Sequence, residues 1–522
     1  MNKYSLKSFS LSRSSLLSLL LLVAMVPWAD ARNDPEKTSV SETNSLATPE
    51  ILSASDTGEL RLTLQESILT GLENNPEIMV ERLNPAIRQT QEDQERAQFD
   101  PTLSSSFYYQ KTSSPGAAKK NQSEQFSGGV SVDTFLPTGT TIGISEENSG
   151  SDPGGSLGTD TSSRLGVNVN QSLLRGAGTG VNLASLRQAK LDTLSSEYEL
   201  RGYAESLVSS IEKAYWNYYV SQLSLQIYKD SLDLAQKQLD ETRERINVGK
   251  LSESELAAAK AEVALRNEEL INARSTEDTN RLKMLRLLTP RKGNYWNMQV
   301  FLRDVPSPPV QALDSVETLV QAGLQKRPDL RQAQLQLQRG ELDVVKSKNG
   351  LLPKLDLFVN LGGTGYSRTF TVTFGNLNGD YYDLQAGFSF EYPLFNRSAK
   401  AKHRAAQLGR DQYELSLVNM EQLVQEDIRT AYIEVNRTIQ QIDATKATRL
   451  SQEESLRSET EKFRVGKSTS LLVAQAQRDY LSSQIEEVQA LTNYVLALVD
   501  LYRLNGSLLE RYGLSAQYVE NK

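Results

Sequence analysis

The sequence of 522 residues contains no cysteine and a single histidine, His403. Without cysteine the chain cannot form a disulfide, a thiolate metal site or a cysteine nucleophile. A single imidazole excludes a cluster of histidine metal ligands. The 57 basic and 65 acidic residues give a net charge of −8, which argues against a nucleic-acid partner. We therefore expect no cofactor and no metal site.

Long apolar runs are also absent, apart from one near the N-terminus. Three basic residues precede the apolar run 16–26, and the small-x-small sequence 29–31 follows it. This order predicts a secretory signal peptide over residues 1–31, since the run is shorter than the roughly 20 residues that a membrane-spanning anchor needs. No cysteine follows the cleavage site, so we expect no lipoprotein anchor. Residues 32–58 are rich in Ser, Thr, Asp and Glu and predict a flexible leader.

Proline placement divides the rest of the chain. No proline lies between Pro153 and Pro290 or after Pro393, and because proline breaks helix interiors, both stretches can form long helices. Within them, apolar residues recur every seven positions, a pattern typical of paired helices. The first row is Ile211, Tyr218, Leu225, Leu232, Leu239 and Ile246, and the second is Ile428, Val435, Ile442, Arg449, Leu456 and Phe463.

Residues 101–173 and 351–393 are instead rich in Gly, Ser, Thr, Asn and aromatics. Apolar and polar residues alternate there, for example from Tyr382 to Tyr392, and this predicts strands. Such strands suit either a half-buried antiparallel sheet or a transmembrane barrel with aromatic girdles. Residues 129–144 alternate on both sides of a Pro-Thr-Gly turn and predict an additional hairpin. This hairpin either decorates an external loop, which is the interpretation we favour, or adds two strands per chain and widens a barrel.

The two halves of the chain repeat one another. Val248-Gly249-Lys250 and Val465-Gly466-Lys467 lie 217 residues apart, and Asn75-Pro76 and Arg327-Pro328 lie 252 residues apart. In all, five short motifs of the first half recur in the second half, in the same order and at one of these two offsets. Each half is therefore predicted to contain a helix, strands, a long helix, a tight turn and a returning helix.

This repeat predicts the domain organisation. Each half has a first helix, a β segment and a helical hairpin, and an equatorial segment follows each hairpin. The bounds are 59–100, 101–173, 174–289 and 290–316 in the first half, then 317–350, 351–393, 394–505 and 506–522 in the second. One chain has too few strands to close a barrel, and an open set of strands would leave sheet edges without partners. We therefore expect identical chains to close the barrel together.

Together these features resemble the TolC-like outer-membrane efflux protein family. The resemblance covers roughly residues 60 to 505 and includes the Ala214-Tyr215-Trp216 motif and the repeated motifs above. It implies a mostly α-helical chain whose coiled-coil hairpins form a periplasmic α-barrel, with a twelve-stranded antiparallel β-barrel in the outer membrane, both shared by a homotrimer. It also implies the exit duct of a tripartite efflux pump or type I secretion system, joined to a periplasmic adaptor and an inner-membrane pump.

The resemblance also implies where such a duct closes and docks. In relatives, carboxylates at the sixth and ninth positions after the second tip glycine ring the aperture. Here those positions are Leu472 and Gln475, so a hydrophobic constriction that gates by dewetting is an alternative to cation-selective gating. In the first hairpin, the sixth position after the tip glycine is Glu255. Glu255 is a candidate pore carboxylate, but the interpretation that we favour is that it is the capping-box partner of Ser252. The candidate adaptor contacts are Val248, Gly249, Lys250, Val465, Gly466 and Lys467.

Two other classes fit parts of the pattern. A periplasmic adaptor or structural coiled-coil protein also uses a long helical hairpin, but it would carry one hairpin beside separate β-rich domains. A secreted glycosidase would use paired carboxylates, but the acidic pairs here lie at helix-surface spacing. We therefore expect a channel and no enzyme, placed in the outer membrane of a Gram-negative cell in contact with its lipid and extending into the periplasm.

Overall fold

The structure is a computed structural model that describes residues 59–114, 121–152, 160–289, 295–307, 313–368, 370–373, 375 and 381–514. The predicted signal peptide and leader lie outside the described residues, as do parts of both predicted equatorial segments. Among the helices that are described, none is long and apolar enough to cross a membrane.

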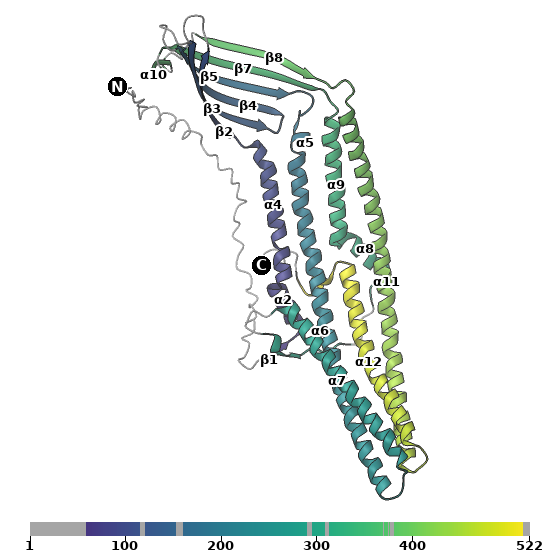
Figure 1. The fold of residues 1–522 in the computed structure, drawn as a ribbon. Helices are drawn as coiled ribbons and strands as arrows, with labels where there is room; N and C mark the ends of the chain where they lie inside the picture. Colours follow the sequence, from purple (N-terminus) through teal and green to yellow (C-terminus); the bar gives the residue numbers. More distant parts are fainter. Residues whose placement is uncertain are drawn as a thin grey trace, which may run out of the picture. The chain divides into compact units, whose positions relative to one another are not determined.

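Two antiparallel helical hairpins make up about half of the described chain (Figure 1). In the first, α6 (Ala184–Asn247) is followed by α7 (Ser254–Leu288). In the second, α11 (Arg397–Arg464) is followed by α12 (Ser470–Leu504). Two further helices stand beside them: α4 (Leu83–Arg96) packs against α6, and α9 (Pro328–Asn349) packs against both α6 and α11.

Both sevenfold rows lie on the buried sides of their helices. Ile211 and Tyr218 are buried in α6, as are Ile428 and Val435 in α11, and the remaining positions are buried or half-buried. Arg449 interrupts the second row, and its guanidinium lies 2.5 Å from the carboxylate of Glu487 in α12. Each fully buried large apolar side chain stabilises the fold by about 1.5–3 kcal/mol, so these rows hold the long helices together.

A layer of short elements surrounds the middle of the long helices. Strands β1 (Glu59–Leu62) and β6 (Gln299–Leu302) pair in parallel. The Tyr215 hydroxyl donates to the carbonyl of Leu62 at 3.3 Å and accepts from the N–H of Asp304 at 3.1 Å. Tyr215 of the Ala214-Tyr215-Trp216 motif thus attaches α6 to this small sheet. The short helices of this layer are α2 (Leu64–Asn74), α3 (Pro76–Glu81), η2 (Tyr295–Asn297), α8 (Val316–Lys326) and α13 (Leu508–Arg511). Three further short helices lie beside the large sheet described below: η1 (Ala97–Phe99), α5 (Thr179–Asn182) and α10 (Phe370–Thr373).

Equivalent positions of the two halves have the same local geometry. Asn75 has φ −66° and ψ 122°, Arg327 has φ −59° and ψ 124°, and a proline begins the next helix in both cases. Four residues before each of these joints is a glycine, Gly71 or Gly323. A Cβ atom at either glycine would overlap the Cδ1 atom of an isoleucine in the long helix behind it, Ile211 or Ile428.

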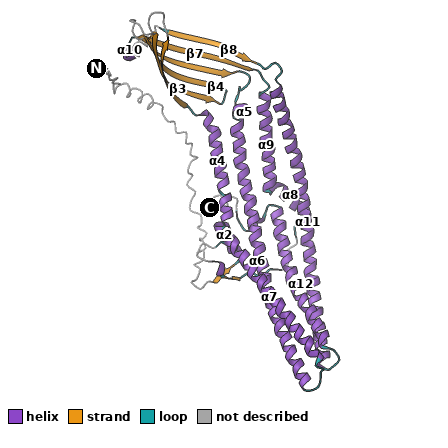
Figure 2. Ribbon diagram, in the orientation of Figure 1, coloured by secondary structure: helices purple, strands orange, loops and turns teal. Residues whose placement is uncertain are grey.

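The remaining strands form one antiparallel sheet at the end of the helices opposite the hairpin turns (Figure 2). The strand order in the described residues is β2-β3-β4-β5-β7-β8, so β2 and β8 are the edges. The bounds are β2 (Thr102–Ser114), β3 (Asn121–Leu136), β4 (Thr140–Asp152), β5 (Asp160–Ser172), β7 (Lys354–Ser367) and β8 (Tyr382–Glu391).

The additional hairpin predicted at residues 129–144 is the inner part of β3 and β4. It lies within the sheet, where β3 pairs with β2 and β4 pairs with β5. The expectation that it decorates an external loop is wrong. The physical reason is that its strands continue to Asn121 and Asp152 and supply the backbone partners of both neighbouring strands.

The glycine contact gives a test of the packing between α8 and α11. Gly323→Ala is expected to lower the free energy of unfolding by about 1–3 kcal/mol, because the added methyl group must displace Ile428 or the helix backbone. Thermal unfolding followed by circular dichroism would measure this.

Gly409→Ala is the matched control, because Gly409 lies within α11 with open space around its Cα. Alanine is a better helix former than glycine by up to about 1 kcal/mol, so this variant is expected to be as stable as the wild type or more so. Equal melting temperatures for Gly323→Ala and Gly409→Ala would contradict the packing argument.

Candidate functional site

Both hairpins turn through the same motif. At each tip, the N–H of the lysine after the glycine donates to the carbonyl five residues back, at 2.8 Å in both cases. The glycine N–H donates to the carbonyl three residues back, at 2.9 Å in the first tip and 3.1 Å in the second. These two bonds define a Schellman motif. Its left-handed position is occupied by Gly249, with φ 72°, and by Gly466, with φ 76°.

The candidate adaptor contacts lie on the surface of these turns. Val248 is 68% exposed and Val465 is 69% exposed. Lys250 and Lys467 are exposed beside them. Each tip therefore presents an apolar side chain next to a cationic one, held at the same position by the same backbone geometry.

The carboxylate of Glu255 contacts the other hairpin rather than Ser252. One carboxylate oxygen of Glu255 accepts a hydrogen bond from the backbone N–H of Ser470 at 3.2 Å and another from the Ser470 hydroxyl. Ser470 is the first residue of α12, and a carboxylate is favourable there because the helix N-terminus carries partial positive charge. The favoured role of Glu255 in a capping box is wrong: α7 begins at Ser254 without a side-chain cap, and the Ser252 hydroxyl accepts from Ser254.

The other two aperture candidates lie on α12 just after this contact. Leu472 is 47% exposed and Gln475 is also exposed, whereas Val473 between them is buried. Residues three apart share a helix face, so Leu472 and Gln475 present one surface. The backbone N–H of Leu472 donates to the hydroxyl of Thr469, the N-cap of α12.

A second contact between the tips was not predicted from the sequence. The guanidinium of Arg245, near the end of α6, donates to the carbonyl of Phe463 at 3.2 Å, and its carbon lies 5.1 Å from the centre of the Phe463 ring. Phe463 ends the sevenfold row of α11, but nothing in the sequence pairs it with Arg245. Together with the Glu255–Ser470 bond, this contact joins the two hairpins of one chain near their tips.

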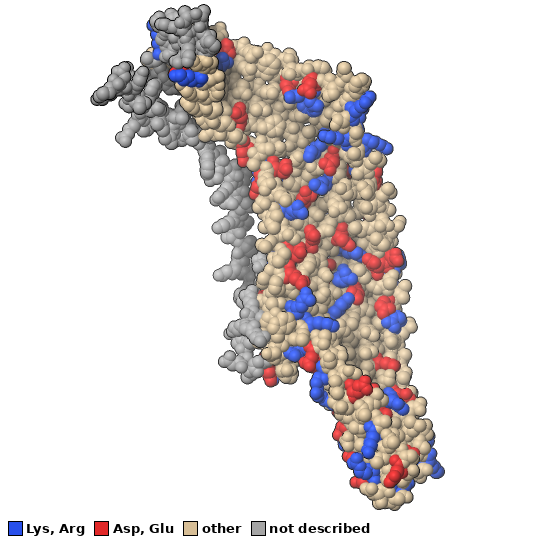
Figure 3. Space-filling model, in the orientation of Figure 1, with Lys and Arg blue, Asp and Glu red and all other residues tan. Residues whose placement is uncertain are grey.

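Toward its helical end the large sheet has one apolar and one polar face, whereas two residues beyond Ile144 the apolar side carries Glu146 of β4. One row crosses all of its described strands in register and consists of exposed apolar side chains, Leu103, Val132, Ile144, Val167, Leu361 and Leu384. The adjacent row on the opposite face contains Thr102, Asp133, Gly143, Asn168, Asn360 and Gln385. On the side drawn in Figure 3, charged side chains are sparse over the sheet and spread over the helices.

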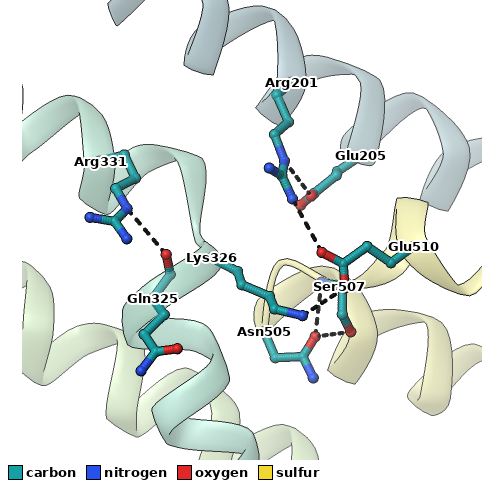
Figure 4. A network of polar contacts seen from close by, with 8 residues as sticks. All are labelled: Arg201, Glu205, Gln325, Lys326, Arg331, Asn505, Ser507 and Glu510. Carbon is teal, nitrogen blue, oxygen red and sulfur yellow. Dashed lines mark hydrogen bonds and ion pairs between the residues drawn. The ribbon is translucent and has the colours of Figure 1, made fainter. Parts of the chain in front are cut away.

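A buried carboxylate lies far from the tips, in the middle layer. The guanidinium of Arg201 lies between Glu205, at 3.6 Å, and Glu510, at 3.9 Å, and the ammonium of Lys326 lies 2.6 Å from Glu510 (Figure 4). These pairs connect α6, α8 and α13. Burial raises the pKa of Glu205 to about 7, and the nearby Arg201 lowers it only in part.

The raised pKa makes part of the stability depend on pH. The folded value of about 7 lies above the ordinary value of 4.5, so the fold favours the protonated carboxyl. This stabilisation is complete below about pH 4.5 and is lost as the pH rises through 7, at a cost on the order of 3 kcal/mol. Glu205→Gln is expected to remove this dependence, measured as the difference in denaturant midpoint between pH 5 and pH 8.

Glu199→Gln is the matched control, because Glu199 is an exposed carboxylate on the same helix. Its pH profile is expected to follow that of the wild type. If Glu205→Gln also follows the wild type, the buried carboxyl does not contribute to the pH dependence.

The comparisons with known proteins agree with this geometry. A family profile described as outer membrane efflux protein matches residues 70–289 and 319–507. The chain is 25% identical over 321 residues to the outer membrane protein TolC of Escherichia coli (strain K12), an alignment covering 59% of this chain and 62% of that protein. It is 26% identical over 340 residues to the pyoverdine export outer membrane protein OpmQ of Pseudomonas aeruginosa, covering 63% of this chain and 67% of that protein.

The fold is also shared with solved structures. The CmeC outer membrane channel of Campylobacter jejuni aligns with a TM-score of 0.63 at 17% identity, covering 90% of this chain and 93% of that one. The open state of the MtrE outer membrane channel of Neisseria gonorrhoeae aligns with a TM-score of 0.61 at 18% identity, covering 85% and 89%. The family profile matches most of both halves of the sequence, which confirms the predicted resemblance, and the chain belongs to the outer membrane efflux protein family.

Proposed function

We propose that three copies of this chain form a channel through the outer membrane, the exit duct of a tripartite efflux pump or type I secretion system. The observation that carries this proposal is the large sheet, whose edges β2 and β8 are open among the described residues and whose faces differ in polarity toward the helical end. Within a membrane, every backbone N–H and C=O needs a partner. Pairing β2 of one copy with β8 of the next supplies those partners and closes a β-barrel.

The directions and faces of the strands support this closure. The described sheet is antiparallel throughout with an even number of strands, so β2 and β8 run in opposite directions and can pair in an antiparallel way across copies. The exposed apolar row then contacts lipid, and the polar row lines a water-filled passage. Membership of the family supports three as the number of copies.

The helices continue the duct into the periplasm. In this proposal α4, α6, α9 and α11 of the three copies form an α-barrel below the sheet, and the hairpins extend it to the tips. The passage closes at the tips, where Leu472 and Gln475 face the axis and form an uncharged constriction. It opens when the adaptor engages Val248, Val465 and their neighbouring lysines and the returning helices separate.

The basic experiment is to extract the protein from cells and determine its assembly. Detergent extraction of the outer-membrane fraction should give a trimer that resists dissociation in dodecyl sulfate at room temperature. Recovery as a soluble monomer, or from the inner membrane, would contradict the proposed function and favour an adaptor-like protein.

The constriction can be tested with disulfides, because the native chain has no cysteine. Leu472→Cys and Gln475→Cys are each expected to form disulfide-linked dimers of subunits under oxidation and to block export, since their side chains meet near the threefold axis. Electrophoresis without reductant and an export assay measure both effects.

The control for this experiment is Leu471→Cys, because Leu471 is 60% exposed on the same helix but points about 100° away from Leu472. After the sample is heated in dodecyl sulfate without reductant, it is expected to run as a monomer on the gel, and it is expected to export normally. If Leu472→Cys and Gln475→Cys behave like Leu471→Cys, these residues do not line the aperture.

The Glu255–Ser470 bond is proposed to hold the tips in the closed arrangement. Glu255→Ala removes a hydrogen bond to a charged group, about 1.5 kcal/mol or more, so the ratio of closed to open channels is expected to fall about tenfold. Single-channel recording in planar bilayers measures the open fraction.

Glu253→Ala serves as the comparison, because Glu253 is an exposed carboxylate in the same turn. Its open fraction is expected to match that of the wild type. An equal open fraction in Glu255→Ala and the wild type would show that this contact does not stabilise the closed tips.

A further inference from the structure

The β3–β4 hairpin consists of full-length strands of the sheet. β3 has 16 residues and β4 has 13, against 13 each for their neighbours β2 and β5. β3 pairs with β2 from Asn121 to Asp133, and β4 pairs with β5 from Thr140 to Ser151. The hairpin therefore takes part in the sheet over its whole length.

The strands of this hairpin are long enough to cross a bilayer. Thirteen residues at about 3.4 Å per residue, tilted by about 40°, span about 34 Å. The outward apolar band of an outer-membrane barrel is about 25 Å tall. Both strands can therefore cross the membrane together with β2 and β5.

Near the helical end of the sheet, the hairpin also continues both of its faces. Val132 and Ile144 stand directly between Leu103 of β2 and Val167 of β5 in the exposed apolar row. On the opposite face, Ser131 of β3 and Ser145 of β4 are directly opposed. Since a slip of one residue would exchange the two faces, this register fits a wall with lipid on one side and water on the other.

The turn of the hairpin is fixed at the helical end of the sheet. The N–H of Ser172 donates to the carbonyl of Gly139, and the N–H of Gly178 donates to that of Thr138, both at 3.0 Å. The side-chain amide of Asn182 donates to the carbonyl of Pro137 at 3.1 Å. Gly139 has φ 88°, a conformation that favours glycine. These bonds hold the short turn against the segment that leads into α6.

In the proposed trimer, the circumference of the helical ring matches that of a strand ring that includes this hairpin. Below the sheet, α4, α6, α9 and α11 pack in that order. In a trimer these helices form a ring of twelve, which at 8–10 Å between axes measures about 96–120 Å around. Eighteen strands spaced about 4.8 Å apart and tilted about 40° form a ring of about 113 Å, whereas twelve form one of about 75 Å.

We infer that the outer-membrane barrel of this protein has eighteen strands, six from each of three chains, with the β3–β4 hairpin facing lipid and lining the passage. This inference rests on the proposed trimeric channel and departs from the twelve strands that the family resemblance implies. The backbone diameter becomes about 36 Å instead of about 24 Å at the same tilt. The outer-membrane segment is then as wide as the helical duct, so cargo size is limited at the hairpin tips.

Cysteine labelling of the assembled trimer in lipid vesicles tests this inference. The single variants Ser131→Cys and Ser145→Cys are expected to react with a sulfonated, membrane-impermeant maleimide. Val132→Cys and Ile144→Cys are expected to react at least about tenfold more slowly, because their thiols face hydrocarbon. A quencher attached to lipid chains should quench a fluorophore on Val132→Cys or Ile144→Cys. It should not quench a fluorophore on Ser131→Cys or Ser145→Cys.

The strand β5 provides matched controls, Asn168→Cys on the polar face and Val167→Cys on the apolar face. If these controls alternate but all four hairpin variants react alike, the hairpin lies outside the wall or inside the lumen, and the inference is overturned while the channel stands. If the β5 controls also fail to alternate, the proposed channel itself is wrong.

Imaging the purified trimer in a lipid nanodisc provides a measurement that does not depend on the variants. A barrel cross-section with eighteen strands is the expected result. A section with twelve strands and an extra hairpin outside the wall would overturn the inference but leave the trimeric channel in place.

Discussion

Backbone hydrogen bonding at the two edges of the large sheet is the constraint on which the rest of this structure depends. In the described residues, β2 and β8 each have a neighbour on one side only, and the sheet between them exposes apolar side chains on one face. Open edges tend to pair with other strands, and large exposed apolar patches tend to be covered. Copies of the same chain and a lipid bilayer satisfy both requirements, and membership of the outer membrane efflux protein family fits this solution.

The two halves of the helical layer share the same packing details. Gly71 and Gly323 receive equivalent isoleucines from the long helices, and both hairpins end in the same Schellman turn. In the proposed trimer, two similar halves per chain would give a ring of six similar units, in which each half meets neighbours of nearly the same shape. The halves also differ, and the additional β3–β4 hairpin of the first half is the difference on which the inferred number of barrel strands depends.

Two expectations were wrong for the same physical reason. The Ser-x-x-Glu spacing at Ser252 and Glu255 fits a capping box, and residues 129–144 fit a decorated loop, when only their neighbours in sequence are considered. In the structure Glu255 bonds to Ser470, 215 residues away, and β3 and β4 complete the hydrogen bonds of β2 and β5. Local sequence offers each segment several partners of similar energy, and contacts between distant segments decide among them.

The sequence alone determined the class of the fold, because its signals are local and periodic. The sevenfold rows predicted which sides of α6 and α11 are buried, and the repeated Val-Gly-Lys motifs predicted a tight turn in each of the two related halves. Only the tertiary structure decided the order of the strands, the partner of Glu255, and the contact between Arg245 and Phe463. Periodicity fixes the conformation and the buried side of a segment, but pairing between segments depends on their register in space, which no local pattern encodes.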